Sequence, residues 1–128
     1  MGLSVGVDLI EIDRVEKALA RYGDRFLRRI YTEGEIAYCM RRRRPGPSLA
    51  ARFAAKEAVF KAASPLAPKG TLLRLRWKQA EVCRGRLGPP VIKLTGAYRE
   101  TVRGRDVSLS LSHGKNYAIA VVVVSAGS

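Results

Sequence analysis

Residues 52–63 have the sequence RFAAKEAVFKAA, and the predicted fold is organised around this stretch. At about 100° per residue, an α-helix places Phe53 and Phe60 in one aromatic stripe. A second face is smooth enough for another backbone to approach closely, and it consists of Ala55, Ala58 and Ala62. The stretch therefore predicts a central helix that packs on both of these faces.

Glu57 lies beside the aromatic stripe of this helix, with Lys61 one turn further along the same side. One interpretation is structural: an i,i+4 ion pair on a core helix, which contributes a few tenths of a kcal/mol. The other is functional, because carboxylates held near apolar surface also mark active sites. The helix alone leaves both open, so the rest of the chain has to separate them.

The N-terminal residues predict a β-strand with one apolar face, because apolar residues alternate with small or polar ones. The apolar face consists of Leu3, Val5, Val7 and Leu9. Asp8 projects from the other face, in the middle of the strand and between apolar neighbours. It is either a water-facing carboxylate of an edge strand or a group with a functional partner.

Two capping-box spacings predict the helices that follow. Asp13 with Glu16 predicts a helix that begins near Arg14, and Thr32 with Glu35 predicts another. If the helical segments on either side of residue 23 are collinear, they present one basic ridge of Arg14, Lys17, Arg21, Arg25 and Arg28. Such a ridge is either a solvated face or a docking surface for an acidic partner.

The run Arg41–Arg44 ends the second of these helices, where cations complement the helix dipole. Alone, four arginines also resemble a nucleic-acid patch. Pro45 and Pro47 then stop the helix, and Ser48 is the predicted N-cap of the central helix.

The C-terminal half predicts mainly strands. Strands are expected over residues 72–84, 91–94, 107–112 and 117–124, with a helix from Thr95 to about Arg103. The single histidine, His113, follows Ser112 at the turn between the last two strands. Strand, helices, then strands with one more helix predict an α+β fold, and 128 residues fit a single domain, residues 1–128.

Composition limits the partners of the chain. The formal net charge is +13, and 17 Arg against 7 Lys make the excess mostly guanidinium, which suits phosphate or carboxylate partners. Cys39 and Cys83 lack metal-ligand spacing and predict reduced, buried thiols. An acidic residue comes too early for a signal peptide, and no apolar run approaches the ~20 residues that span a bilayer. The expected location is the cytoplasm.

Several chemistries are excluded by missing motifs. The chain has no phosphate-binding Gly-x-x-x-x-Gly-Lys loop and no Gly-x-Gly-x-x-Gly motif. One histidine and two cysteines cannot form the usual structural zinc site. Two carboxylates with few other ligands suit Mg²⁺, which keeps several waters and binds substrate phosphates.

Three motifs, in this order, resemble those of the holo-acyl-carrier-protein synthases. Residues 6–14, GVDLIEIDR, resemble the Gly-Ile-Asp-x-x-x-x-x-Arg opening of that family. Residues 52–62 resemble its Arg-Phe-x-x-Lys-Glu-Ala-x-x-Lys-Ala motif. Residues 109–120 resemble its Ser-[Ile/Leu]-Ser-His-x-x-x-Tyr-Ala-x-Ala hairpin. The resemblance extends from residue 3 to about residue 124.

The resemblance implies an activity and a set of site residues. Family members transfer the 4′-phosphopantetheine arm of coenzyme A to a serine of an acyl carrier protein and release adenosine 3′,5′-bisphosphate. By position, Asp8 and Glu57 match the Mg²⁺ carboxylates, Glu57 also steers deprotonation of the serine, and Lys61 neutralises the transferred phosphate. The matched coenzyme A residues are His113 with the backbone around Ser112 for one phosphate, and Arg52 with Lys56 for the 3′-phosphate.

The resemblance also implies the partners and the assembly. Arg14, Arg21 and Arg25 match the positions that dock the acidic recognition helix of the carrier protein. Short members of the family form homotrimers with sites at subunit interfaces, and their core is a small α+β domain with an antiparallel sheet. This chain departs from the family at residues 64–70, where a Gly-Thr-Gly-type loop is usual.

Two alternatives from other classes remain. A small basic nucleic-acid binder would explain the charge, but the aromatic residues do not interleave with the basic ones as a stacking platform requires. A non-catalytic carrier-binding module is the second alternative, and the presence of every matched catalytic residue argues against it.

Overall fold

The computed structural model describes residues 2–84 and 88–125. Within these residues, the larger sheet has three antiparallel strands in the order β1-β5-β4. Their bounds are β1 (Ser4–Glu11), β4 (Val107–His113) and β5 (Tyr117–Val124). β5 is the central strand and its buried residues are apolar, as predicted for residues 117–124.

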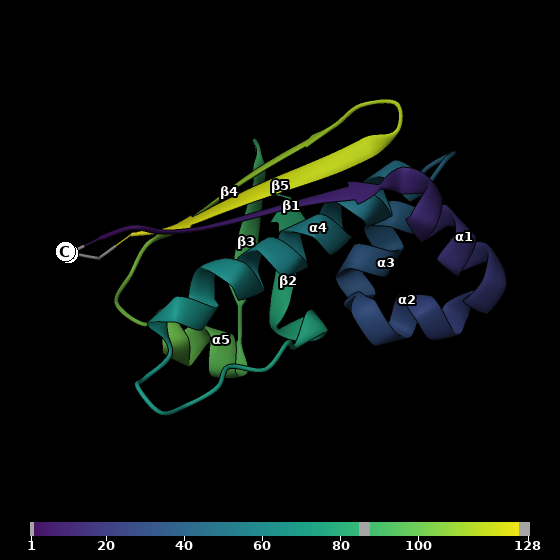
Figure 1. Cartoon of the computed structure of the whole chain (residues 1–128). Helices are drawn as coiled ribbons and strands as arrows, with labels where there is room; N and C mark the ends of the chain where they lie inside the picture. The colour runs from purple at the N-terminus through teal and green to yellow at the C-terminus, as the bar shows by residue number, and fades with distance from the viewer. Residues whose placement is uncertain (1, 85–87, 126–128) are drawn as a thin grey trace.

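The central helix α4 (Gly46–Ala63) lies along one face of this sheet (Figure 1). Its alanine face makes the closest contact, as the sequence predicted. A Cβ atom at Gly6 would lie 1.9 Å from the carbonyl oxygen of Ala58 and 2.8 Å from the amide nitrogen of Ala62, so only glycine fits there. Ser4 Oγ adds a 2.6 Å hydrogen bond to the carbonyl oxygen of Ala62. α4 and β1 are therefore in backbone contact.

The apolar face predicted for β1 exists, but it points away from α4. Val5, Val7 and Leu9 are exposed, whereas Gly6 and Ile10 face the helix. The physical reason is the close approach of α4, which leaves room only for a glycine at position 6. In register, Val123, Val121 and Ile119 of β5 stand beside the three exposed residues and extend this outer apolar face.

Three short helices gather at one end of the molecule (Figure 1). They are α1 (Ile12–Tyr22), α2 (Asp24–Ile30) and α3 (Glu33–Met40). The Thr32–Glu35 capping box is confirmed. The capping predicted for Asp13 is wrong: α1 begins at Ile12, directly after β1, and has no side-chain cap. α1 and α2 are not collinear, because Gly23 turns the chain between them at φ 53°.

The remaining elements form a smaller layer against the other side of α4. β2 (Ala80–Arg84) and β3 (Pro90–Leu94) make a second antiparallel sheet, and α5 (Gly96–Thr101) follows. Short 3-10 turns lie at Ser64–Leu66 and Trp77–Gln79. The strand predicted for residues 72–84 is thus much shorter, because Trp77 packs its ring on Phe53 at 4.9 Å instead of continuing the strand. Ser48 lies inside α4 and caps nothing there.

Cys39 is a buried free thiol and Cys83 a half-buried one. In the part of the chain that the structure describes, no helix is long and apolar enough to cross a membrane.

Candidate active site

The first cluster of predicted site residues lies where α4 crosses β1. Lys61 of α4 donates from Nζ to Asp8 Oδ1 and to the carbonyl oxygen of Val7, both at 3.1 Å. The side chain of Asp8 is only 14% exposed and faces the helix. Lys61 is therefore paired with Asp8 and not with Glu57, so the structural i,i+4 interpretation is not what the fold adopts.

Glu57 shares this cluster electrostatically. Partial burial raises the pKa of the Glu57 carboxyl, and the nearby charge of Asp8 raises it further, whereas Lys61 and Arg14 lower it. Two neighbouring carboxylates in a half-buried place are oxygen donors of the kind that a hard cation binds. Among the described residues, no third histidine, cysteine or carboxylate completes a metal-binding group with them.

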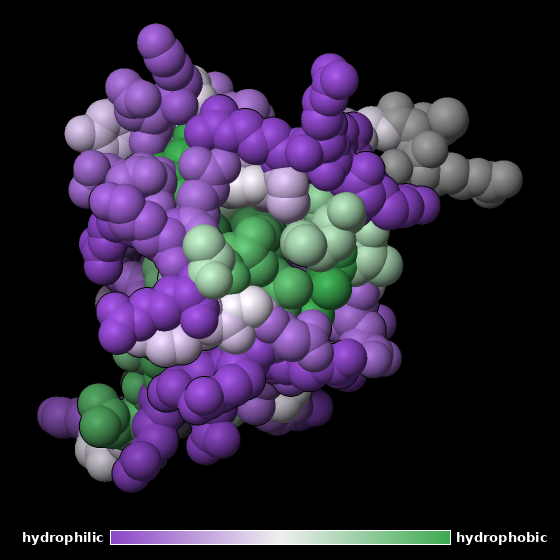
Figure 2. Space-filling view, turned by 90° about the vertical axis from the view of Figure 1, so that its right-hand side faces the viewer, coloured by the Kyte–Doolittle hydropathy of each residue, from purple (hydrophilic) through white to green (hydrophobic). Residues whose placement is uncertain are grey.

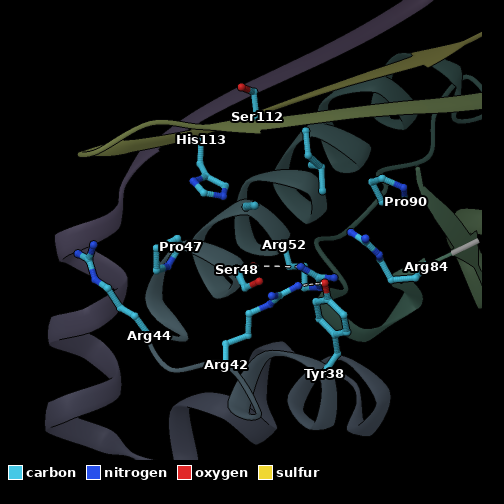
Figure 3. A pocket seen from close by; sticks show the side chains of 12 residues that line it. Tyr38, Arg42, Arg44, Pro47, Ser48, Arg52, Arg84, Pro90, Ser112 and His113 are labelled. Carbon is cyan, nitrogen blue, oxygen red and sulfur yellow. Dashed lines mark hydrogen bonds between the residues drawn. The ribbon is translucent and has the colours of Figure 1, made fainter. Parts of the chain in front are cut away.

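The second cluster surrounds a cavity of about 430 Å³ between α3, α4, β2 and the end of β4. Figure 3 shows His113 turned from β4 toward Pro47 and Ser48, whereas the Ser112 side chain points to the opposite side of the strand. Ser112 thus offers its backbone to this cavity, as strand alternation requires.

Three guanidinium groups converge on one aromatic ring in this cavity. The Cζ atoms of Arg52, Arg42 and Arg84 lie 4.5, 4.7 and 5.6 Å from the centre of the Tyr38 ring. Arg42 also donates a hydrogen bond to the Tyr38 hydroxyl, and Arg52 Nη1 donates to the carbonyl oxygen of Ser48 at 3.4 Å. Nε of Arg52 is buried and has no partner among the described residues. Like charges gathered this way repel one another unless an anion lies between them.

Lys56 is not part of this cavity. Its ammonium group is fully buried, 2.7 Å from Glu35 Oε1, and it donates to the carbonyl oxygens of Trp77 and Ala80 at 2.9 and 2.6 Å. Burial lowers the pKa of Lys56, which the charge of Glu35 opposes. With these partners in the protein interior, the side chain does not reach a phosphate, so the predicted coenzyme A contact of Lys56 does not fit its position.

The three arginines predicted to bind a partner are exposed on α1 and α2. Arg25 lines a cavity of about 420 Å³ between these helices, together with Ala18, Tyr22, Phe26 and Arg29. Figure 2 shows this end of the molecule, where a small apolar area is framed by hydrophilic side chains. Two members of the predicted ridge are engaged locally, since Lys17 pairs with Asp13 and Arg28 with Asp24. Arg14, Arg21 and Arg25 have no such carboxylate partner in the described chain.

The two clusters flank α4 on different sides. Arg52 and Glu57 are five residues apart, which is a rotation of about 140° around the helix axis. Asp8 on β1 and Leu111 on β4 both pair with Ala120 of β5, so the clusters are level along the strands but on opposite edges of the sheet. One chain therefore presents two separate clusters, a carboxylate cluster and an arginine cluster, with its own helix between them.

The protein family of this chain follows from comparison with known proteins. Residues 4–122 match the model of the 4′-phosphopantetheinyl transferase superfamily. A holo-[acyl-carrier-protein] synthase of Chlamydia trachomatis serovar D is 47% identical over 119 residues, covering 93% of this chain and 96% of that protein. One of Moorella thermoacetica is 43% identical over 125 residues, covering 95% and 93%. The chain belongs to the holo-[acyl-carrier-protein] synthase family.

Solved structures agree with this assignment. A Chronobacterium ammoniagenes ACPS–CoA complex superposes with a TM-score of 0.82 at 28% identity, covering 98% of each chain. A holo-(acyl-carrier-protein) synthase from Bacillus anthracis, in complex with CoA (3′,5′-ADP), has a TM-score of 0.75 at 33% identity, covering 98% of this chain and 96% of that one.

Sequence reasoning singled out the Arg41–Arg44 run but did not bring Arg42 together with Tyr38 and Arg84 in one cavity. Arg42 follows Tyr38 by four residues, a spacing that places the two on one helical face and could have indicated the pair. Arg84 lies at the end of β2, far from Tyr38 in sequence. No local pattern predicts that contact, because it depends on how β2 packs beside α3.

Proposed function

We propose that this chain transfers the 4′-phosphopantetheine group of coenzyme A to a serine of an apo-acyl carrier protein and releases adenosine 3′,5′-bisphosphate. The observation that supports this most is the convergence of Arg42, Arg52 and Arg84 on Tyr38, in a cavity that also contains His113. A bisphosphate nucleotide supplies the negative charge that such a cavity lacks.

In this proposal, the cavity holds the nucleotide end of coenzyme A. Arg52 binds the 3′-phosphate, because it lines the cavity and its guanidinium is held by Ser48 and Tyr38. His113 and the backbone at Ser112 bind another phosphate at the mouth of the cavity. Arg42 and Arg84 add charge to the same site.

Asp8 and Glu57 fit a Mg²⁺ ion, since both are carboxylates, the charge of Asp8 acts on Glu57, and each is only partly exposed. When bound, the ion would neutralise the pyrophosphate of coenzyme A. Lys61 stands beside Asp8 with half of its side chain exposed, so its ammonium group can also meet the transferred phosphate.

Positioning and charge neutralisation supply most of what phosphoryl transfer needs. The serine oxygen of the carrier protein forms a bond to the phosphorus that bears pantetheine, and the bond from that phosphorus to the bridging oxygen breaks. Adenosine 3′,5′-bisphosphate leaves with the bridging oxygen. Glu57, with its pKa raised by burial and by Asp8, is the group placed to steer removal of the serine proton.

The acidic carrier protein docks on α1 and α2 in this proposal. Arg14, Arg21 and Arg25 are exposed there, and the net charge of +13 favours association with an acidic surface. Arg14 also lies close enough to Glu57 to lower the pKa of that carboxyl. The docking surface therefore adjoins the carboxylate cluster, where the serine has to arrive.

A homotrimer joins the half-sites in this proposal. Asp8 on the β1 edge of the sheet forms one half-site with Glu57 of α4, and His113 on the β4 edge forms the other with Arg52 of α4. Copies arranged head to tail bring these unlike edges together. The exposed apolar face of β1 at Val5, Val7 and Leu9 supplies surface for that contact.

Incubation with coenzyme A, Mg²⁺ and purified apo-acyl carrier proteins of fatty-acid and polyketide types is expected to increase the intact mass of a carrier protein by one phosphopantetheine group. The measurement is mass spectrometry of the carrier protein. Omitting Mg²⁺ is the control for the metal. No mass gain with any carrier protein would exclude the transfer.

The interface location of the site predicts complementation between two inactive variants. Co-expressed Glu57→Gln and His113→Ala chains are expected to recover up to about one quarter of the wild-type rate, because random assembly pairs two intact half-sites about that often. Each variant alone stays inactive. A co-expressed mixture no more active than the single variants would show that both half-sites must belong to one chain.

A further inference from the structure

Arg44 differs from the other arginines that line the nucleotide cavity, because it is held by a carboxylate of α1. Nε of Arg44 donates to Glu16 Oε2 at 2.8 Å, and Nη2 donates to Glu16 Oε1 at 3.0 Å. The contact is bidentate, which sets the plane of the guanidinium as well as its place. In Figure 3, Arg44 stands at the α1 side of the cavity, away from the group around Tyr38.

The backbone leaves space for this pair at the start of α4. A Cβ atom at Gly46 would lie 2.2 Å from Glu16 Oε2 and 2.4 Å from Glu16 Cγ, so the carboxylate packs directly on the glycine. The Glu16 side chain is only 30% exposed, although the Arg44 side chain is 60% exposed. Glu16 is thus the more buried member of the pair, and Arg44, which lines the α1 edge of the cavity, is the more exposed one.

We propose that Glu16 is a positioning residue that orients Arg44 at the mouth of the cavity for a phosphate of the bound nucleotide, an inference that rests on the proposed function. A guanidinium has five N–H donors, and Glu16 engages two of them. The other three remain for an anion. An unrestrained arginine at this exposed place would lose its side-chain freedom on binding, and the contact with Glu16 removes that freedom beforehand.

Whether removal of Glu16 weakens or tightens nucleotide binding distinguishes a positioning role from a purely electrostatic one. Glu16 is a negative charge beside an anion site, so its charge alone opposes nucleotide binding, and removing it would tighten binding. If Glu16 orients Arg44, its removal weakens binding instead. Asp13 provides a matched control, since it is a carboxylate on the same turn of α1 and pairs with Lys17, which does not line the cavity.

The test is calorimetric titration of the full-length protein with adenosine 3′,5′-bisphosphate. Glu16→Gln is expected to weaken binding about fivefold, whereas Asp13→Asn leaves it unchanged or slightly tighter. Arg44→Gln is expected to weaken binding too, and Glu16→Gln/Arg44→Gln is expected to bind like Arg44→Gln alone, because Glu16 acts through Arg44. In turnover, Glu16→Gln is expected to raise the KM for coenzyme A and leave kcat unchanged.

Binding by Glu16→Gln that equals or exceeds wild-type binding would overturn the inference and leave the proposed function standing. Additive losses in the double variant would overturn it as well, since Glu16 would then act independently of Arg44. Failure of the wild-type protein to bind the bisphosphate would overturn the proposed function itself. Thermal melts of all variants check that each of them is folded.

Discussion

Glu57→Gln is expected to lower the rate of phosphopantetheine transfer about a thousandfold or more, because glutamine keeps the size of the side chain and loses its charge and basicity. The charges of Asp8, Lys61 and Arg14 all act on this carboxyl, so it belongs to the cluster where α4 crosses β1. The measurement is kcat at saturating coenzyme A, Mg²⁺ and carrier protein. A variant within tenfold of the wild-type rate would remove Glu57 from the mechanism.

Unfolding in urea is the control for Glu57→Gln, and the pKa shift of Glu57 predicts how the stability difference from wild type depends on pH. The pKa of Glu57 is raised in the folded protein, first by burial and then by Asp8. A raised pKa means that the neutral form contributes stability below the unfolded value of 4.5, and that this contribution is lost as pH rises through the folded value. Glu57→Gln should therefore unfold at the same or higher urea concentration than wild type at pH 8. The stability advantage of Glu57→Gln over wild type should shrink toward pH 4.5, because the wild-type carboxyl then becomes neutral as well.

Lys56→Met is expected to destabilise the fold by about 3–5 kcal/mol, since it leaves the Glu35 carboxylate buried without its cation. Both side chains of this pair are fully buried. The ammonium group also satisfies the carbonyl oxygens of Trp77 and Ala80, which would lose their donor. The measurement is the free energy of unfolding in urea at neutral pH.

Two further variants check the cause of that loss. Lys56→Met/Glu35→Gln is expected to be more stable than Lys56→Met, because no buried charge remains without a partner. Lys17→Met removes a lysine from an exposed pair with Asp13 and is expected to change stability little. A small loss for Lys56→Met would contradict this prediction, since the buried carboxylate would then not depend on its cation.

The parts of the fold that local pattern controls could be predicted from sequence. The alanine face of α4, the Thr32 capping box and the apolar strand β5 are all as expected, since each depends on spacing within one segment. The orientation of β1 could not be predicted, because both of its faces are compatible with a strand. The contact of Gly6 with Ala58 decided which face turns inward.

The candidate site, too, could be predicted from sequence only in part. The motifs singled out Asp8, Lys61 and Glu57 but did not say whether they meet within one chain. In the structure they gather, because α4 crosses β1 at a position set by the small residues. Lys56 could not be placed from sequence. It precedes Glu57 by one residue, yet the turn of the helix sends it into the interior, where its partner Glu35 comes from α3. A lysine in a basic motif gives no local sign of such a partner.

The outward apolar face of β1 has a consequence for a newly made chain. β1 is an edge strand, so its outer backbone groups and its exposed Val5, Val7 and Leu9 can pair with the edges of other chains in disordered aggregates. The surplus of arginine opposes this, since chains with a net charge of +13 repel one another. The positive charge thereby protects the chain from self-association through this edge.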